Sequence, residues 1–486
     1  MPIHTPIQMP FQTPFVGRAT ELGYLKQLPA KRVASFVVIT GRRRIGKSRL
    51  VEEFGKGKVF YTFSGLAPTD KTTAQDQREE FARQIHSHWG IGGLKATDWG
   101  DLLDIVVQQV SRGKAILFFD EISWMGSLDP TFLGKLKIVW DLALSKNPKL
   151  IFILCGSVSS WIEKNILSST GYFGRVTQKI ALEELKLPDC KAFFEKVGFK
   201  GSTIEALLLL AITGGVPWYL ELIHPGRSML ENIKQLCFTK DGILVDEYRH
   251  IFHDLFGKRN ALYQKIVETL ASGALTYQEI SHKIHYASGG PLSEYLNELI
   301  LSGFIRRELT WNIQSGHETH TAQFRISDNY LRFYLKYIKP SLPKIKRNQF
   351  QDLTLSQLTG FHTMMGFQFE NLILNNRELI FKQLGLTSQD IVNDNPYFQK
   401  KTSKQAACQI DYLIQTRFKT LYLCEIKFSK NPMGKSIIAE MQEKIKRLSR
   451  PKGFACLPVL IHVSRVSESV VESDFFAKII DVSSVF

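Results

Sequence analysis

The sequence predicts an α/β protein whose first domain is built on a parallel sheet. Three apolar segments carry this prediction, and they lie at residues 35–40, 115–119 and 150–156. Continuous apolar runs of this length are typical of strands buried on both faces of a sheet. Between the first two, residues 97–112 place most of their apolar side chains on one side, as a crossover helix requires. These side chains are Leu102, Leu103, Ile105, Val106 and Val110.

The first strand runs into a glycine-rich loop and then a helical segment, residues 48–54. The loop follows the pattern GxxxxGK[ST] and consists of Gly41, Arg42, Arg43, Arg44, Ile45, Gly46, Lys47 and Ser48, with Arg49 next. In such a loop, backbone N–H groups and a helix N-terminus face phosphate oxygens. Lys47 would reach the β and γ phosphates, and Ser48 would ligate Mg²⁺. The loop therefore predicts a nucleoside triphosphate site.

Polar side chains stand at the ends of the other two predicted strands. Asp120 and Glu121 end the second, and Ser157 ends the third. Asp120 would hold Mg²⁺ directly or through water, while Glu121 would polarise the water that attacks the γ-phosphate. Open α/β sheets bind ligands at the carboxyl ends of their strands. These residues therefore belong with the phosphate loop.

Composition limits the remaining possibilities. A chain of 486 residues is expected to form roughly three domains. No segment approaches the ~18 apolar residues that span a bilayer, and no secretory signal is visible, so we expect a cytoplasmic protein without a membrane partner. The six cysteines form no CxxC pair, which argues against structural zinc. The net charge of +16 favours a polyanionic partner, nucleic acid first.

Together these motifs resemble the archaeal-type P-loop ATPases of the AAA+/STAND group, over residues 15 to about 340. The resemblance rests on FVGR (15–18), the phosphate loop, DEISW (120–124), LCGS (154–157), YFGR (172–175) and GGVP (214–217). It implies ATP and Mg²⁺ as cofactors, with Phe15, Val16, Gly17 and Arg18 near the adenine. One departure weakens the adenine-side assignment: the family often has Glu after Gly-Arg, and this chain has Ala19.

The same resemblance assigns roles to three further residues. Ser157 would be the sensor of the γ-phosphate, and Pro217 would lie in a helical lid over the nucleotide. Arg175 would act as an arginine finger or a phosphate sensor, within the chain or on a neighbouring copy in a homo-oligomer. A surface arginine after a glycine turn is the alternative for Arg175, and the sequence leaves the choice open.

The middle segment follows the pattern of a winged helix. Helices are predicted at 261–271, 276–285 and 292–301, and wing strands at 304–311 and 321–326. The third helix carries Glu294 and Glu298 and no Lys or Arg, the wrong sign for approach to DNA phosphates. A structural role is therefore favoured over nucleic-acid contact. Residues 331–350 then hold six basic residues, no acid and several aromatics, which suits a solvated connector or a phosphate-binding strip.

The C-terminal segment contains two predicted hairpin strands, at 408–414 and 420–427. Alternation along the second strand puts Glu425 and Lys427 on one face, with Asp411 in reach on its neighbour. Asp411 and Glu425 could hold Mg²⁺, and Lys427 could orient or deprotonate an attacking water. This arrangement resembles the PD-(D/E)xK nuclease core, and Glu370, on the apolar stripe of the preceding helix, fits the same set.

We therefore expect six segments: a tail (1–14), an ATPase core (15–180), a helical lid (181–255), a winged helix (256–335), a basic connector (336–350) and a nuclease-like domain (351–486). The predicted function is an ATPase whose nucleotide state controls a metal-dependent nuclease-like domain acting on nucleic acid, DNA first. The alternative is a regulatory ATPase switch with a C-terminal domain that only binds. A nuclease-like fold that has lost its metal would suit that alternative.

Overall fold

The structure is a computed structural model that describes residues 13–67, 69, 71–126, 128–157, 159–354, 357–403, 405–429, 432–463 and 465–486. Residues 1–12 of the predicted tail lie outside this part of the chain. In the described ranges, none of the helices combines the length and apolarity needed to cross a membrane.

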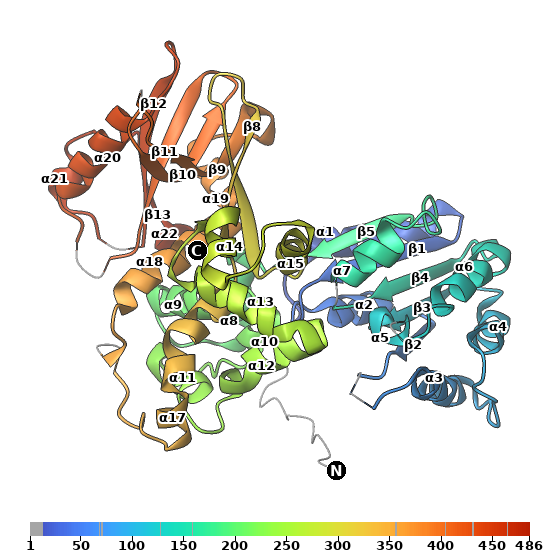
Figure 1. Cartoon of the computed structure of the whole chain (residues 1–486). Helices are drawn as coiled ribbons and strands as arrows, with labels where there is room; N and C mark the ends of the chain where they lie inside the picture. The colour runs from blue at the N-terminus through green and yellow to red at the C-terminus, as the bar shows by residue number, and fades with distance from the viewer. Residues whose placement is uncertain are drawn as a thin grey trace.

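The N-terminal domain is a five-stranded parallel sheet with strand order β2-β3-β4-β1-β5, as the α/β prediction required (Figure 1). Its strands are β1 (Ser35–Gly41), β2 (Phe60–Ser64), β3 (Ala115–Asp120), β4 (Leu150–Cys155) and β5 (Gln178–Leu182). The three predicted strands occupy the centre and are buried on both faces. The two strands that were not predicted from the sequence, β2 and β5, form the edges of the sheet.

Helices cover both faces of this sheet. One face packs on α1 (Ala19–Gln27) and α2 (Lys47–Gly55), and the other on α3 (Ala74–Trp89), α4 (Trp99–Val110) and α6 (Phe132–Leu142). Alternation along β1 explains this: Val37 and Ile39 belong to the first core, and Phe36 and Val38 to the second. The predicted crossover helix is α4, with the Asp98 side chain accepting from the Gly100 N–H at its start.

Five helices follow β5. They are α8 (Leu187–Val197), α9 (Thr203–Thr213), α10 (Pro217–Glu221), α11 (Met229–Cys237) and α12 (Ile243–Phe256). Capping boxes start α9 at Ser202 and Glu205 and α11 at Ser228 and Glu231. Helix α9 is apolar along most of its length, and it packs both on α11 of the same helical region and on two later helices, α16 (Asn329–Phe333) and α18 (Phe361–Asn375).

The helices and strands predicted for the winged helix are present. Its elements are α13 (Asn260–Thr269), β6 (Leu275–Thr276), α14 (Tyr277–Ile284), α15 (Gly290–Leu301), β7 (Ile305–Trp311) and β8 (Glu318–Ile326). The wing is docked on the C-terminal domain: the Trp311 indole N–H donates to the Gln415 side chain at 2.5 Å, and the Gln415 amide donates to the Ile313 carbonyl at 2.9 Å. The wing therefore serves as an interdomain contact.

The predicted basic connector begins as part of the core. After α16 the chain continues through a π-helical turn (Tyr334–Ile338) into α17 (Lys339–Lys346). The aromatic residues Phe333, Tyr334 and Tyr337 are buried, while most of the lysines are exposed. The aromatics are thus unavailable for stacking on nucleic-acid bases, which favours the solvated-connector interpretation over the strip.

The C-terminal domain is a second sheet, with strand order β13-β12-β11-β10-β9. Its elements after α18 are α19 (Arg377–Leu384), β9 (Ile391–Gln399), β10 (Cys408–Thr416), β11 (Thr420–Lys427), α20 (Ser436–Arg447), β12 (Ala455–His462), α21 (Glu468–Val471), β13 (Lys478–Asp481) and α22 (Val482–Val485). The predicted hairpin is the antiparallel pair β10–β11, and β11, β12 and β13 run parallel. Helix α18 packs on β11, and α20 on β10.

Candidate functional site

The phosphate loop adopts the geometry that its sequence predicts. It leaves β1 at Gly41 and enters α2 at Lys47, with Gly46 in the left-handed region (φ 86°). Gly41 allows a close approach of chains, since a Cβ there would lie 2.6 Å from the Leu182 carbonyl oxygen. The Lys47 ammonium donates to the Gly41 and Arg42 carbonyl oxygens at 3.0 and 2.9 Å. These carbonyls hold the lysine inside the loop.

The three predicted strand-end residues meet the loop. Ser48 Oγ donates to Asp120 Oδ2 at 2.6 Å. Two oxygens this close together could ligate the same Mg²⁺. The Ser157 N–H and Oγ donate to the two carboxylate oxygens of Glu121 at 2.9 and 2.5 Å. Lys47 Nζ lies 3.4 Å from Ser157 Oγ. The donor set therefore fits a magnesium nucleotide.

Glu121 has a left-handed backbone (φ 50°), a strained conformation for a residue with a side chain. Such strain is found where the surrounding structure over-determines a residue, often at functional sites. In this conformation the Glu121 carboxylate accepts from the Ser157 N–H and Oγ. The predicted sensor and the predicted catalytic glutamate thus form one unit at the end of the sheet.

A cavity of about 530 Å³ lies beside these residues. The predicted Phe15, Val16, Arg18, Arg43, Arg44, Ile45, Gly46, Lys47, Ser48, Arg49, Glu121, Ser157 and Pro217 line it. Sequence reasoning missed the remaining lining residues, which are Thr13, Pro14, Trp124, Leu185, Phe193, Trp218 and Glu221. A volume of this size suits a nucleotide. The cavity has an apolar end and a phosphate end.

Arg18 and Gly17 shape the apolar end from behind. Arg18 is buried, and its guanidinium donates to the carbonyl oxygens of Ile45 and Glu183 at 3.1 and 2.7 Å. Gly17 is left-handed (φ 66°), and a Cβ there would lie 2.7 Å from the Asp189 carboxylate. Arg18 thus braces the loop, while Phe15 and Val16 supply apolar wall.

Comparison with known proteins agrees with this geometry. Residues 15–223 match the family model described as an ATPase domain predominantly from Archaea. The match indicates an archaeal-type ATPase domain at residues 15–223. An uncharacterized protein of Methanocaldococcus jannaschii is 25% identical over 360 residues, which make up 74% of this chain and 76% of the relative.

Solved structures also match the chain. The Walker-type ATPase of Pyrococcus abyssi matches with a TM-score of 0.48 and 17% identity, over 66% of this chain and 96% of that one. The Aeropyrum pernix ORC2 protein, in its ADPNP–ADP complexes, matches with a TM-score of 0.41 and 13% identity, over 70% and 96%.

The three loop arginines of the ATPase domain form ion pairs with acids in other segments. Arg42 pairs with Glu184 at 3.0 Å and with Asp328, Arg43 pairs with Asp254, and Arg44 pairs with Glu247 at 3.2 Å. Arg44 also stacks on Trp218, 3.8 Å from the ring centroid. Two of these acids lie in α12 and one precedes α16, so the loop is tied to the lid and to the segment after the wing.

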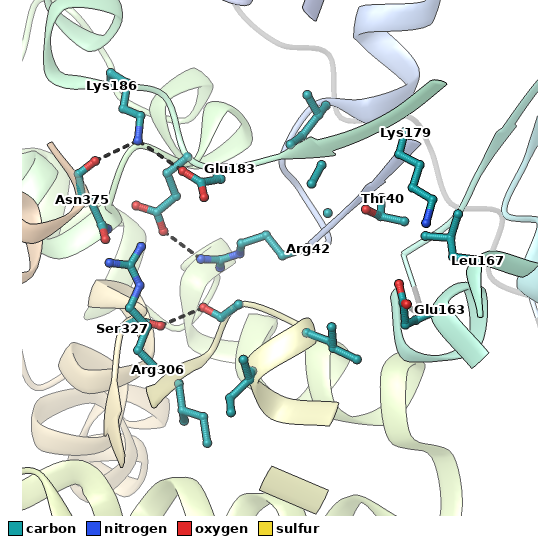
Figure 2. Close-up of a pocket in the computed structure, with 18 residues that line it drawn as sticks. Thr40, Arg42, Glu163, Leu167, Lys179, Glu183, Lys186, Arg306, Ser327 and Asn375 are labelled. Atoms are coloured by element: carbon teal, nitrogen blue, oxygen red, sulfur yellow. Dashed lines mark hydrogen bonds and ion pairs between the residues drawn. The ribbon is translucent and has the colours of Figure 1, made fainter. Parts of the chain in front are cut away.

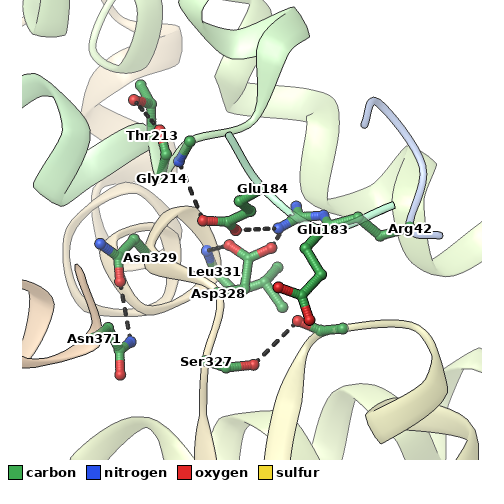
Figure 3. A network of polar contacts seen from close by, with 12 residues as sticks. Arg42, Glu183, Glu184, Thr213, Gly214, Ser327, Asp328, Asn329, Leu331 and Asn371 are labelled. Carbon is green, nitrogen blue, oxygen red and sulfur yellow. Dashed lines mark hydrogen bonds and ion pairs between the residues drawn. The ribbon is translucent and has the colours of Figure 1, made fainter. Parts of the chain in front are cut away.

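The Arg42 pair is the most buried of the three. Arg42 is 6% exposed and Asp328 1% exposed. Burial opposes the charge of Arg42, but the carboxylates of Asp328 and Glu184 raise its pKa above the ordinary value. Figure 3 shows this network, with Asp328 also accepting from the Leu331 N–H at the start of α16.

Arg175 of the ATPase domain does not line the nucleotide cavity. Its guanidinium forms a bidentate ion pair with Asp141 of α6 at 2.6 and 2.8 Å. These hydrogen bonds hold the pKa of Asp141 down at about 2. The role of Arg175 as an arginine finger or phosphate sensor stays a prediction.

A second cavity, of about 500 Å³, lies where the ATPase domain meets the C-terminal half (Figure 2). It is lined by Thr40, Gly41 and Arg42 at the start of the loop, by Arg306 of β7 and by Asn375 at the end of α18. Lys186 Nζ donates to the Asn375 carbonyl oxygen at 2.9 Å across the junction. The phosphate loop therefore borders this junction.

In the C-terminal domain the structure brings Asp411, Glu425 and Lys427 together. A β-bulge between Ile410 and Leu413 interrupts the pairing of β10 with β9, which lets β10 re-aim a side chain at this point. Asp411 Oδ2 accepts from the Ile426 N–H at 3.0 Å. Lys427 Nζ lies 2.9 Å from Glu425 Oε1. Glu425 is only 1% exposed, so this pair is largely shielded from water.

Sequence reasoning missed Lys444 of α20 at this site. Its Nζ lies 2.5 Å from Glu425 Oε2 and 3.5 Å from Asp411 Oδ1. Helical spacing could have found it, because Lys444 follows Ile437 and Met441 by seven and three residues and shares their side of the helix. Both carboxylates thus point at one cation position, and this donor set fits Mg²⁺. Among the described residues, no group of three or more His, Cys, Asp or Glu side chains is arranged to hold a metal.

The charges of this C-terminal site shift the pKa values of its members. Burial opposes the charge of Lys427, but Glu425 raises the Lys427 pKa and keeps it an ammonium, which favours orienting a water over deprotonating it. Burial and the Glu425 carboxylate raise the pKa of Asp411. Burial raises the pKa of Glu370 to about 7; Asp411 and Glu308 add to the rise, and Arg325 and Arg332 oppose it.

Proposed function

We propose that ATP binding and hydrolysis in the N-terminal domain control a Mg²⁺-dependent nuclease-like site in the C-terminal domain, with DNA as the substrate. The observation that carries this proposal is the convergence of Asp411, Glu425 and Lys427 beside a bulged strand. Two carboxylates aimed at one cation position, with a lysine beside them, are the groups that metal-assisted phosphodiester hydrolysis uses. The net charge of +16 favours a polyanionic substrate.

At the N-terminal site, each residue has a defined part in hydrolysis. Lys47 would exchange its bonds to the Gly41 and Arg42 carbonyls for phosphate oxygens, and Ser48 with Asp120 would hold Mg²⁺. Magnesium supplies charge neutralisation on the phosphates. Glu121, once released by Ser157, would orient the attacking water.

Coupling would pass through Arg42. Its carbonyl is a Lys47 acceptor, and its guanidinium pairs with Asp328, so a shift of this residue bears on the start of α16. The next residue, Asn329, exchanges hydrogen bonds with Gln368 of α18 at 2.6 and 3.2 Å. Asn371 donates to Asn329 at 3.0 Å. Helix α18 packs in turn on β11, the strand that carries Glu425 and Lys427, so this path leads to the second site.

The test is DNA cleavage with Mg²⁺, with and without ATP, by the wild type and by Asp411→Ala. We expect cleavage by the wild type, a change of its rate with ATP, and loss of cleavage in Asp411→Ala with ATP turnover retained. Glu472→Ala, an exposed acid in the same domain, is the matched control. Equal cleavage by Asp411→Ala and the wild type would refute the site.

The path itself has a separate test. Asp328→Asn removes the buried charge opposite Arg42 and leaves Glu184 in place, so ATP turnover should persist while the effect of ATP on cleavage disappears. Asp254→Asn, which breaks the Arg43 pair instead, should keep the ATP effect. An unchanged ATP effect in Asp328→Asn would rule out this route.

A second candidate function is an ATPase switch whose C-terminal domain binds nucleic acid without cleaving it. Its supporting observation is that lysines already contact both oxygens of Glu425. Binding of DNA by the chain without cleavage in either Mg²⁺ or Mn²⁺, at normal ATP turnover, would favour this candidate.

A further inference from the structure

We infer that the ammonium of Lys444 acts as a built-in cation that competes with divalent metal for Asp411 and Glu425. The inference rests on the proposed function in one respect, the assignment of these two carboxylates as metal ligands. It adds a residue and a gating step to that assignment.

The first support is position. Lys444 Nζ contacts one oxygen from each carboxylate, Glu425 Oε2 at 2.5 Å and Asp411 Oδ1 at 3.5 Å. These oxygens come from two neighbouring strands, and the point between them is where a hard cation with oxygen ligands would bind. The other oxygens already have donors, Lys427 on Glu425 and the Ile426 N–H on Asp411. The ammonium therefore takes the shared position.

The second support is charge. The ammonium groups of Lys427 and Lys444 offset the charges of Asp411 and Glu425, although Lys427 also pairs with the half-exposed Glu440 at 3.3 Å. Removal of Lys444 would make this cluster more negative by one charge and so more attractive to an entering metal ion. Because Glu425 is almost fully buried, water screens these charges weakly and the difference is felt strongly.

The third support is that Lys444 can leave. Its side chain is 25% exposed and ends a flexible stem on α20, so the ammonium can move toward solvent without moving the helix. A DNA phosphate at the rim of the site is negatively charged, like Glu425, and would offer the Lys444 ammonium an alternative partner. Nucleic acid and metal should therefore bind cooperatively, with the backbone phosphate drawing Lys444 out of the site.

The test measures Mn²⁺ binding to the nucleotide-free full-length chain by electron paramagnetic resonance, first without DNA. Lys444→Met should bind Mn²⁺ more tightly than the wild type by on the order of tenfold or more, because one buried repulsive charge is gone. Lys446→Met makes the same charge change at an exposed position of the same helix and should keep wild-type affinity. Asp411→Asn added to Lys444→Met should abolish the gain.

A short DNA duplex then tests the gating. It should tighten Mn²⁺ binding in the wild type and have little further effect in Lys444→Met. Equal affinities of Lys444→Met and the wild type would overturn the inference, as would an equal gain in Lys446→Met. Lys444→Gln, with circular dichroism of each variant, guards against a folding defect of the methionine variant.

The outcomes separate this inference from the proposed function. Tighter Mn²⁺ binding by Lys444→Met, with no DNA cleavage by the wild type, would refute the nuclease proposal and support the competition between Lys444 and metal. DNA cleavage that depends on Asp411, with Mn²⁺ affinity unchanged in Lys444→Met, would do the reverse.

Discussion

At the residue scale, Lys47 lies inside the phosphate loop, where its ammonium would face the β and γ phosphates of ATP. Lys47→Ala should weaken ATP binding by on the order of 100-fold, because the charge opposite the β and γ phosphates is lost. A fluorescent ATP analogue titrated into each variant measures it. Lys56→Ala, an exposed lysine just after α2, should bind like the wild type. Retained affinity in Lys47→Ala would contradict the phosphate-loop assignment.

Glu121 has a different expected profile. Glu121→Gln keeps a group that can accept from Ser157 but loses the negative charge that polarises water, so ATP should still bind while kcat falls by on the order of 100-fold. Phosphate release at saturating ATP measures it, with the exposed Glu52→Gln as the control. A wild-type kcat in Glu121→Gln would assign the catalytic role elsewhere.

Glu370 should make the free energy of unfolding depend on pH. Its folded pKa of about 7 lies above the ordinary value of 4.5, so the folded state holds this proton more tightly and loses stability as pH rises between those values. Glu370→Gln removes that loss. The stability of Glu370→Gln relative to the wild type should therefore be greater at pH 8 than at pH 4.5, by roughly 2 to 3 kcal/mol. Urea unfolding at both pH values checks this, and a pH-independent difference would contradict it.

At the scale of elements, the wing ties the winged helix to the C-terminal domain. Trp311 is 2% exposed, packs on Tyr397 with ring centroids 5.1 Å apart, and bonds to Gln415. Trp311→Ala should cost about 3 to 5 kcal/mol of unfolding free energy. Denaturant titration measures it, with Phe418→Ala, a 65% exposed aromatic, as a near-neutral control. A cost below about 1 kcal/mol would mean that the wing is not firmly docked.

The same scale separates what a sequence pattern can predict from what it cannot. The central strands and α4 were predictable because burial on both faces or on one stripe leaves a period in the sequence. The edge strands β2 and β5 are only five residues long and partly buried, which is too short for a pattern to stand out in the sequence.

Contacts between residues far apart in the sequence could not be predicted either. Helical spacing marks Lys444 as inward-facing, but only the fold shows which carboxylates it meets. The acids that pair with the loop arginines lie more than 140 positions away, and nothing local to the loop identifies them. Chemistry carried by contiguous motifs was thus predictable, while its regulation was not.

At the scale of the whole molecule, the core is divided unevenly. One cluster of buried side chains runs from Val16 through the lid and winged helix to Phe486, whereas the faces of the ATPase sheet have two clusters of their own. We expect calorimetry to show two transitions. A nonhydrolysable ATP analogue at 100 times its Kd should stabilise the sheet by about 2.7 kcal/mol, and the coupled lid by part of that. A single transition whose midpoint temperature stays the same when the ATP analogue is added would contradict this division.

The shared core also bears on how such a protein can change over evolutionary time. Helix α9 contacts α16, α18 and α22, so its apolar surface is matched to the C-terminal half. A foreign domain fused after residue 350 would leave that surface uncovered, and exposed apolar patches promote aggregation. Recombination within this lineage should therefore exchange the lid together with the C-terminal domain, as one inherited block.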